Sequence, residues 1–341
     1  MLSKMIEALY LKVFVNIIVK RASTIVYIEI HSKKKVLNSI HSEFETTSLN
    51  DKMLAFIQKY IKESPYYYIS ILDRAVVQGA LPSCQKQKML FYKDMSDSEY
   101  RCYDGKWAYY TAKSEMYETE KIYESIGLDF IFSPFVLIAK FFKDKIVGKI
   151  AIYVLIEDNY LSIAVFEDEY LLYAKHCDLD TISEIDDILL SDNVDVDEEL
   201  DFDDSGIDLE SMDVDDDGIE LEDFGEIEDL DSLEDIDEFD DSKDVEEELL
   251  ESDTDLKEAD VVDKSNEDYQ RFSAIQSAVA DYYKDERYES KFLENIYIAD
   301  GIGVSRELKK YLEEEMFLNV YIRHMEIDVE ICELAQEELS S

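Results

Sequence analysis

The stretch "IYIADGIGVSRELKKYLEEEM", residues 296–316, joins an apolar run, two glycines and an amphipathic segment. This pattern predicts a buried strand, a glycine turn and a helix that Ser305 caps at its N-terminus. Strand–glycine–helix units occur in many α/β proteins, and in some of them the turn binds a nucleotide. Two glycines alone are a weak sign of a nucleotide site, so the role of Gly301 and Gly303 depends on the rest of the chain.

The charge of the chain is concentrated in one segment. The chain has 341 residues and a net charge of −48, and residues 178–263 hold 42 acidic residues against two lysines, so this segment alone contributes −40. Such a composition predicts disorder, because self-repulsion is strong and apolar content is low. The remainder is rich in Ile, Leu, Val, Phe and Tyr and is long enough to bury a core. We therefore expect a globular protein that carries a long acidic insert.

Cysteine and histidine spacings give no sign of a metal site or a disulfide framework. The cysteines lie far apart with no CxxC pair, which predicts reduced thiols in a cytoplasmic protein, with a disulfide as the alternative; they are Cys84, Cys102, Cys177 and Cys332. The histidines are expected to be structural or exposed; they are His31, His41, His176 and His324. The apolar run near the N-terminus is broken by Lys12 and is shorter than the ~20 residues of a membrane-spanning helix.

Local patterns repeat in two halves of the chain. Residues 13–45 predict three strands, followed by a helix with Ser48 as its cap and a strand at 66–72. A second group of three strands begins at Ile150, and it is followed after the acidic segment by a helix, the quoted unit, a strand and a closing helix. Between the halves, the stretches "QGALPSC", "FYKDM" and "KWAYYTA" predict short strands of a small α+β unit.

These patterns predict the domain boundaries. Residues 1–145 form the first lobe, including the small unit at about 73–125. Residues 146–180 and 265–341 form the second lobe, and residues 181–264 are the acidic low-complexity insert.

The order of elements resembles the actin-like ATPases, and the small unit in the first lobe resembles that of FtsA and of the pilus protein PilM. The closing stretch "FLENIYIADGIGVSRELKKYLEEEMFLNVYI" is most similar to PilM-type proteins, and the cytoplasmic domain of GspL is a second relative of this shape. The resemblance covers residues about 10–180 and 265–341. It implies an α/β, two-lobed actin-like (ribonuclease H-like) fold with a small α+β subdomain in the first lobe and the acidic disordered insert in the second.

The nucleotide motifs of that family are degenerate in this chain. Active members carry an Asp-x-Gly in each of two hairpins, where glycine lets the backbone approach phosphate and the carboxylate holds Mg²⁺. The first hairpin, "FVNIIVKRAS", offers Asn16 and no glycine, and the second, "YVLIEDNYLS", offers Glu157 and Asp158 and no glycine. Gly301 and Gly303 are therefore interpreted as a vestigial adenosine-side turn, and no catalytic residue, cofactor or metal is expected.

The resemblance implies a non-catalytic cytoplasmic scaffold, peripheral to the inner membrane. PilM-like proteins dock the cytoplasmic tail of a PilN-like membrane protein in a type IV pilus, a secretion or DNA-uptake pseudopilus or a flagellar-motor assembly. The expected docking residues lie in and beside the small unit, although each aromatic among them also suits its core; they are Tyr67, Gln78, Trp107, Tyr109 and Tyr110. A ring or other oligomer is compatible with this role.

Two other functions remain open. The first is a nucleotide-binding, FtsA-like ATPase. The second is an acidic adaptor or weak calcium-binding protein, because "DVDDDGIELEDF" resembles an EF-hand loop but places Phe224 where a bidentate carboxylate is required. The insert suits a basic surface, such as one on a motor or secretion ATPase, and its charge excludes nucleic acid as a partner.

Overall fold

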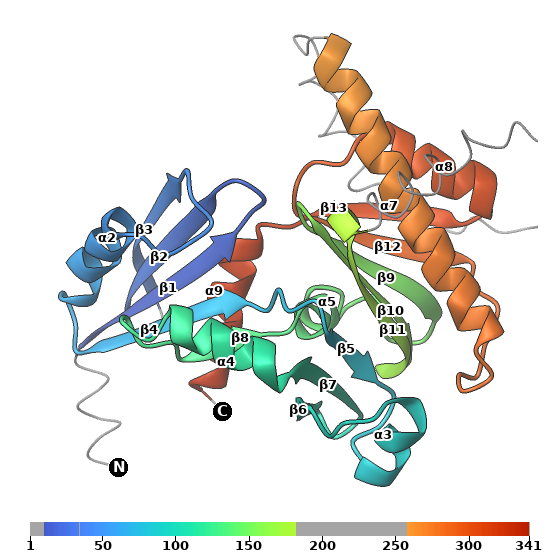
Figure 1. Ribbon diagram of the computed structural model, residues 1–341, viewed down its shortest axis with the longest axis horizontal. Helices are drawn as coiled ribbons and strands as arrows, with labels where there is room; N and C mark the ends of the chain where they lie inside the picture. Colours follow the sequence, from blue (N-terminus) through green and yellow to red (C-terminus); the bar gives the residue numbers. More distant parts are fainter. Residues whose placement is uncertain (1–9, 34, 182–257, 341) are drawn as a thin grey trace, which may run out of the picture.

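A computed structural model describes residues 10–33, 35–181 and 258–340 of the chain. These residues form two lobes, with a small unit below the junction between them (Figure 1). The predicted acidic insert and its EF-hand-like loop fall on residues 182–257, outside the described residues.

The first lobe is built on a five-stranded sheet with the order β3-β2-β1-β4-β8. The first three strands form an antiparallel meander, whereas β4 joins β1 and β8 joins β4 in parallel. The elements of this lobe are β1 (Leu11–Val19), β2 (Thr24–Ser32), β3 (Lys35–Phe44), α2 (Asp51–Ile61), β4 (Tyr66–Leu72), α4 (Lys113–Ile122) and β8 (Phe130–Phe132).

The second lobe repeats this arrangement with the order β11-β10-β9-β12-β13. Its first three strands are again an antiparallel meander, and β12 and β13 again extend the sheet in parallel. Two sheets with the same 3-2-1-4-5 order define the two-lobed, ribonuclease H-like architecture, as predicted. The elements are α5 (Pro134–Phe141), β9 (Ile150–Ile156), β10 (Tyr160–Glu167), β11 (Tyr170–Asp178), α7 (Glu258–Lys284), β12 (Asn295–Asp300), α8 (Arg306–Met316), β13 (Asn319–His324) and α9 (Ile327–Glu338).

The small unit is a three-stranded sheet of order β5-β7-β6 with one helix. Its elements are β5 (Gln78–Leu81), α3 (Lys86–Tyr92), β6 (Ser98–Tyr103) and β7 (Trp107–Ala112). The prediction of four reduced thiols is wrong for two of them, because a disulfide joins Cys84 to Cys102, whose Cα atoms are 5.6 Å apart. The chain reverses through α3 and so brings the two cysteines together, which their spacing of 18 residues did not reveal. Cys177 and Cys332 are free and buried.

The helix and strand boundaries predicted from local sequence patterns agree with the structure in most places. The Ser305 side chain caps α8, as predicted, and Pro134 is the first residue of α5. The cap of α2 is Asn50 rather than Ser48, because the Asn50 side chain accepts the Met53 N–H at 2.9 Å. The stretch "FYKDM" is not a strand: its first residues end α3, where Met89 faces inward against the small sheet.

Side chains alternate between the two faces of each sheet, and the two sheets together therefore bury three apolar layers. Odd-numbered residues of β1 such as Val13 and Val15 pack toward α2, and even-numbered residues of β9 such as Ile152 and Val154 pack toward α7 and α8. The opposite faces of both sheets share one central core with α5 and α9.

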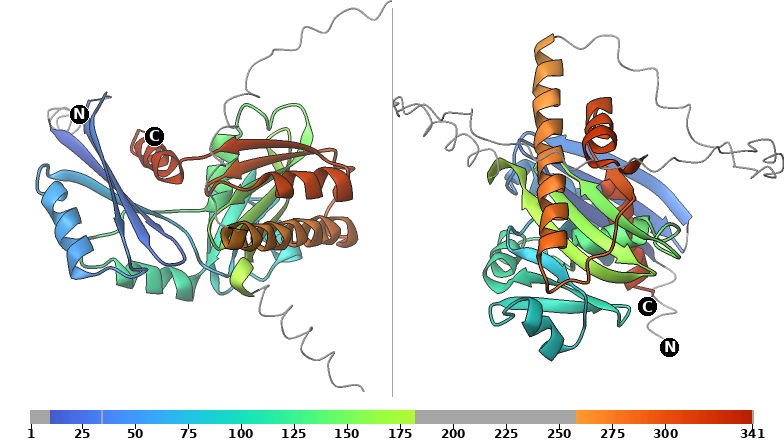
Figure 2. Two further views of the ribbon diagram at one scale, coloured as in Figure 1. Left: turned by 90° about the horizontal axis from the view of Figure 1, so that it is seen from above. Right: turned by 90° about the vertical axis from the view of Figure 1, so that its right-hand side faces the viewer.

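The last helix belongs spatially to the first lobe. The prediction assigned residues 265–341 to the second lobe, but α9 packs against β1, β2 and β4 (Figure 2). The chain therefore crosses from β13 back to the first sheet and ties the two lobes together.

Candidate functional site

The carboxyl ends of β1, β4, β9 and β12 meet where the two lobes adjoin. Ligands of α/β sheets bind at such strand ends. The backbone N–H of Arg21, in the turn after β1, donates to Asp158 Oδ2 in the turn after β9 at 2.8 Å. The guanidinium of Arg74, just after β4, lies 4.7 Å from the ring centroid of Tyr160. The two hairpins and the end of β4 are thus in direct contact.

The first hairpin carries its polar residue inside the sheet rather than at the turn. Asn16 pairs with Tyr27 in the middle of the β1–β2 ladder, and its side chain is fully buried. Its Oδ1 accepts a hydrogen bond from the Ser70 hydroxyl on β4. The turn itself closes through a bond from the Lys20 N–H to the Ser23 carbonyl oxygen at 2.7 Å. Asn16 therefore does not occupy a phosphate-facing position.

The second hairpin buries a carboxyl group. Glu157 is 4% exposed, and its N–H donates to the Tyr160 carbonyl oxygen at 2.9 Å. Burial raises the pKa of Glu157 to about 7; the Arg74 charge opposes the rise, while Asp73 and Asp158 add to it. Glu157 is thus a carboxyl group that titrates near neutral pH in a shielded place.

In the glycine turn after β12, the backbone N–H groups donate to carboxylates of the same chain. The Asp300 carboxylate accepts the N–H groups of Ile302, Gly303 and Val304 at 3.0, 2.8 and 2.9 Å. The next N–H, of Ser305, donates to Asp268 on α7 at 3.0 Å. These four N–H groups, in the turn that leads into α8, therefore already have carboxylate acceptors.

Each glycine of the turn has a structural reason. A Cβ on Gly301 would lie 2.5 Å from Ile327 Cδ1 and 2.9 Å from the Ile156 carbonyl oxygen, so this position must be glycine for the strands and α9 to pack. Gly303 adopts φ +83°, a conformation that side chains disfavour.

Arginine side chains occupy the space between the lobes. The Arg21 guanidinium pairs with Asp180 and lies 3.5 Å from Glu267 of α7. Arg271, also on α7, is buried and pairs with Asp268 at 2.7 Å. The sequence interpretation missed Arg21, Asp268 and Asp300; only the Asp-Gly pair at 300–301, which is typical of turns, was a usable signal.

A second polar cluster connects the small unit to the second lobe. The Gln78 side chain is buried, donates to the carbonyl oxygens of Asp73 and Ala75, and lies 3.3 Å from His176 Nε2. Tyr160 stacks on the His176 ring with centroids 5.3 Å apart. Burial, together with the Arg74 charge, lowers the pKa of His176 to about 4, so this ring is neutral at physiological pH.

The predicted docking residues do not form one surface. Trp107 is 1% exposed and stacks on Tyr103 in the interior, where it also contacts Phe166 of the second lobe. Gln78 is buried in the cluster above, Tyr109 and Tyr110 are half-buried on β7, and Tyr67 is 37% exposed on β4. A pocket of about 30 Å³ beside Trp107 holds about one water molecule.

Other apolar residues of the small unit are the exposed ones. Leu90 and Phe91 on α3 are 52% and 62% exposed, and Tyr100 on β6 is 39% exposed. Strand β6 is an edge of the small sheet and pairs only with β7. The misassignment of α3 as a strand concealed Leu90 and Phe91 from the sequence interpretation.

These features define the class of protein: a two-lobed chain of the actin-like fold, whose central strand ends are bridged by its own side chains. Residues 10–139 match the family described as "Domain of unknown function (DUF8569)", and residues 152–340 match that described as "Domain of unknown function (DUF8341)". The chain belongs to the DUF8341 family. A search of curated proteins gave no match.

Solved structures with this arrangement are distant. A PilM–PilN type IV pilus biogenesis complex contains a chain 10% identical, with 92% of this chain and 88% of that chain covered and a TM-score of 0.46. A Bacteroides thetaiotaomicron protein with an actin-like ATPase fold and unknown function is 12% identical, with 91% and 90% covered and a TM-score of 0.43. The ethanolamine utilization protein EutJ from Carboxydothermus hydrogenoformans is 8% identical, with 94% and 89% covered and a TM-score of 0.40. The fold assignment rests on the two sheet orders, not on these similarities.

Among the helices of the described residues, none is both long and apolar enough to cross a membrane.

Proposed function

We propose that this protein is a non-catalytic scaffold of the PilM type, which docks the cytoplasmic tail of an inner-membrane partner. One observation carries the non-catalytic part: the N–H groups of the turn before α8 already have acceptors, three in Asp300 and the fourth in Asp268. A polyanion entering the cleft would have to displace these two carboxylates.

The charges around the cleft support the same proposal. Asp158, Asp180 and Glu267 surround Arg21 at the opening between the hairpins. Arg271 is likewise engaged by Glu267, at 2.9 Å, and by Asp268. Because Arg21 and Arg271 already have carboxylate partners, these two side chains offer little attraction to the phosphates of ATP.

Calorimetric titration of the full chain with ATP and Mg²⁺ tests this part. We expect no saturable binding at micromolar concentrations. The matched variant is Asp300→Ala, which frees the turn N–H groups and removes one negative charge. If the unmodified protein binds ATP–Mg²⁺ with micromolar affinity, or hydrolyses it in a manner abolished by Glu157→Gln, the non-catalytic assignment is wrong.

The edge of the small unit supports the docking part. An extended peptide can pair with an edge strand while its side chains contact neighbouring apolar groups. Strand β6 offers such an edge, with Tyr100 on it and the exposed Leu90 and Phe91 on α3 of the same unit. The identity of the partner as a PilN-like tail follows from the resemblance of the sequence to PilM-type proteins, and Tyr67, Tyr109 and Tyr110 remain predicted contacts.

Peptide binding tests the docking part. The probe is a peptide with the cytoplasmic N-terminal segment of the PilN-like protein from the same organism. We expect Tyr100→Asp and Phe91→Asp to weaken its binding at least tenfold, which corresponds to about 1.4 kcal/mol. Phe292→Asp, at a still more exposed aromatic side chain of the second lobe, is the control and should bind normally. Normal binding by folded Tyr100→Asp and Phe91→Asp variants would refute this docking surface.

One observation supports the competing function, that of an FtsA-like nucleotide-binding protein. Carboxyl groups with raised pKa values cluster at functional sites, and burial raises the pKa of both Asp73 and Glu157 beside the cleft. The ATP titration separates the two functions.

A further inference from the structure

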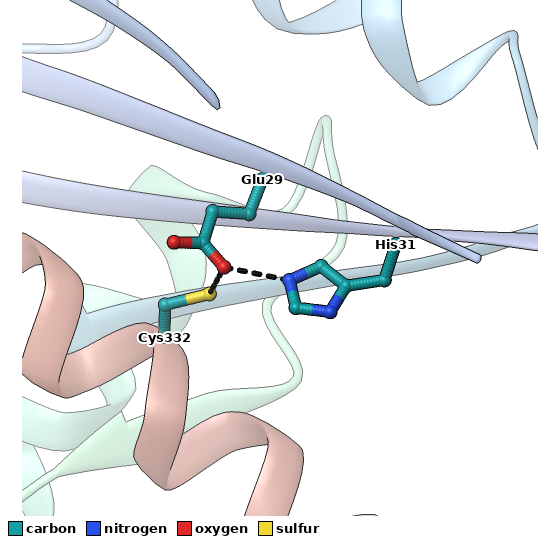
Figure 3. Close-up of side chains that lie close together, drawn as sticks. All are labelled: Glu29, His31 and Cys332. Carbon is teal, nitrogen blue, oxygen red and sulfur yellow. Dashed lines mark hydrogen bonds and ion pairs between the residues drawn. The ribbon is translucent and has the colours of Figure 1, made fainter. Parts of the chain in front are cut away.

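A buried group of three side chains lies between the first-lobe sheet and the last helix (Figure 3). Glu29 and His31 come from β2, and Cys332 comes from α9. Glu29 Oε2 lies 2.6 Å from His31 Nε2 and accepts a hydrogen bond from Cys332 Sγ at 3.2 Å. The three potential ligand atoms all lie within 4.8 Å of one another. Their residues are 6%, 4% and 0% exposed, so the group is shielded from solvent.

The positions of these residues follow from the strand period. Val26, Ile28 and Ile30 of β2 face α2, so the intervening residues Glu29 and His31 face α9. That face also carries apolar side chains, among them Phe14, which contacts the His31 ring edge-on with centroids 5.1 Å apart. Polar groups in such a layer cost stability unless each has a partner, and these three side chains are partners of one another.

The surrounding side chains orient the group toward one point. Tyr27 donates its hydroxyl to Glu29 Oε1 at 2.6 Å, which leaves Oε2 directed at His31 and Cys332. Gln336, one turn after Cys332 on α9, places its amide end 3.4 Å from Cys332 Sγ and 3.5 Å from His31 Nε2. If the amide is rotated so that its oxygen faces these atoms, a fourth donor atom joins the group.

A second, independent observation concerns Asn16. This residue is fully buried on the same face of the sheet, and its Nδ2 group has no hydrogen-bond partner of good geometry among the described residues. It lies beside the Cys332 sulfur, with which it interacts. A thiol is a weak acceptor, whereas a metal-bound thiolate accepts N–H bonds well. A metal ion on Cys332 would therefore give the Nδ2 group of Asn16 a better acceptor than the free thiol.

We propose that Glu29, His31 and Cys332 bind one divalent metal ion of the zinc type, with the Gln336 amide oxygen as the fourth ligand. One sulfur, one imidazole nitrogen and oxygen donors form a ligand set that zinc accepts and that magnesium and calcium do not favour. The carboxylate and the thiolate neutralise the two positive charges, so the buried site has no net charge.

The ligand side chains need to move only a little to bind such an ion. A tetrahedral ion with bonds of about 2.0–2.3 Å holds its ligand atoms about 3.3–3.8 Å apart. The Glu29–His31 and Cys332–Glu29 separations of 2.6 and 3.2 Å must therefore widen by about 1 Å or less, which side-chain rotation provides. On binding, the Cys332 thiol releases its proton to solvent, and neutral His31 carries its proton on Nδ1 so that Nε2 can bind the ion.

The position of the site gives the ion a structural role. Because the three ligands close together only when α9 packs on β2, the ion would enter during folding. It would fix α9, which follows β13 of the second lobe, to the sheet of the first lobe. The ion would thereby hold the two lobes in one arrangement.

The experiment compares the full chain refolded with Zn²⁺, with Co²⁺ and without metal. After weakly bound ions are removed, we expect about one zinc per chain and a Tm that rises by about 5 °C or more when free Zn²⁺ exceeds its Kd about 100-fold. Co²⁺ should give the near-ultraviolet charge-transfer band of a thiolate ligand. This band is decisive, because carboxylates of the acidic segment cannot produce it.

The variants make the test specific. Cys332→Ser should lose the ion and the band, whereas Cys177→Ser, which changes the other free buried cysteine, should keep both. His31→Gln serves as a second variant if Cys332→Ser does not fold. A refolded unmodified chain without a thiolate–Co²⁺ band, or a band that persists in Cys332→Ser, would overturn the proposal, and the group would then be a hydrogen-bonded network only.

Discussion

The buried carboxyl group of Glu157 makes the stability of the folded protein depend on pH. This carboxyl group is buried, and its pKa is raised from 4.5 to about 7. A raised folded-state pKa means that the folded protein holds the proton more tightly than the unfolded chain, so protonation stabilises the fold. The contribution is complete below the unfolded value near 4.5, and it is lost as the pH rises through about 7.

The magnitude follows from the size of the shift. A difference of about 2.5 pH units corresponds to about 3 kcal/mol at about 1.4 kcal/mol per unit. Glu157→Gln keeps the size of the side chain and removes its titration. Above pH 7 the variant should therefore be more stable than the unmodified protein by up to about 3 kcal/mol, and the difference should disappear below about pH 4.5.

The assay is urea unfolding of both proteins between pH 4.5 and pH 8. His176 changes stability in the opposite sense, because its lowered pKa removes stability as the pH falls from its unfolded value toward about 4. Since His176 is present in both proteins, its effect cancels in the difference between them. A difference that does not change with pH would show that Glu157 is solvated and that the buried description is wrong.

Three further outcomes are expected. Gly301→Ala should destabilise the fold by about 1–3 kcal/mol in urea unfolding, because its Cβ would overlap Ile327 Cδ1 and the Ile156 carbonyl oxygen; an unchanged midpoint would contradict this close packing. Cys84→Ser should lower stability by about 3 kcal/mol under oxidising conditions and by nothing under reducing ones, as a closed loop of 18 residues implies. Replacing residues 182–257 by a short flexible linker should leave Tm nearly unchanged, since the composition of the insert predicts no contribution to the core; a large drop in Tm would show that the insert packs on the core.

Much of the fold could be predicted because its signals are local. β-branched runs, turn residues and the cap at Ser305 specify strands and helices within a few residues of themselves. The repeat of meander, helix and strand then limits the topology to two sheets of the same order. The prediction of α3 as a strand failed because "FYKDM" is too short to show a helical period.

The residues of the candidate site were harder to predict from the sequence than the fold. Trp107 and Gln78 read as docking residues in sequence, yet both are buried at contacts with the second lobe. Whether an aromatic side chain lies in a core or on a surface depends on what the rest of the chain packs against it, and the sequence alone does not contain that information.

The sequence by itself determined the two-lobed α/β plan, the lack of an Asp-x-Gly in the two hairpins and the acidic character of the insert, because these depend on composition and short-range pattern. Only the tertiary structure decided which distant residues meet. It paired Cys84 with Cys102, placed Asp268 over the turn at Ser305, and brought Cys332 from the last helix to His31 on the second strand. A side-chain cluster of this kind forms because α9 crosses back to the first sheet, and 300 residues of separation leave no local pattern from which that contact could be inferred.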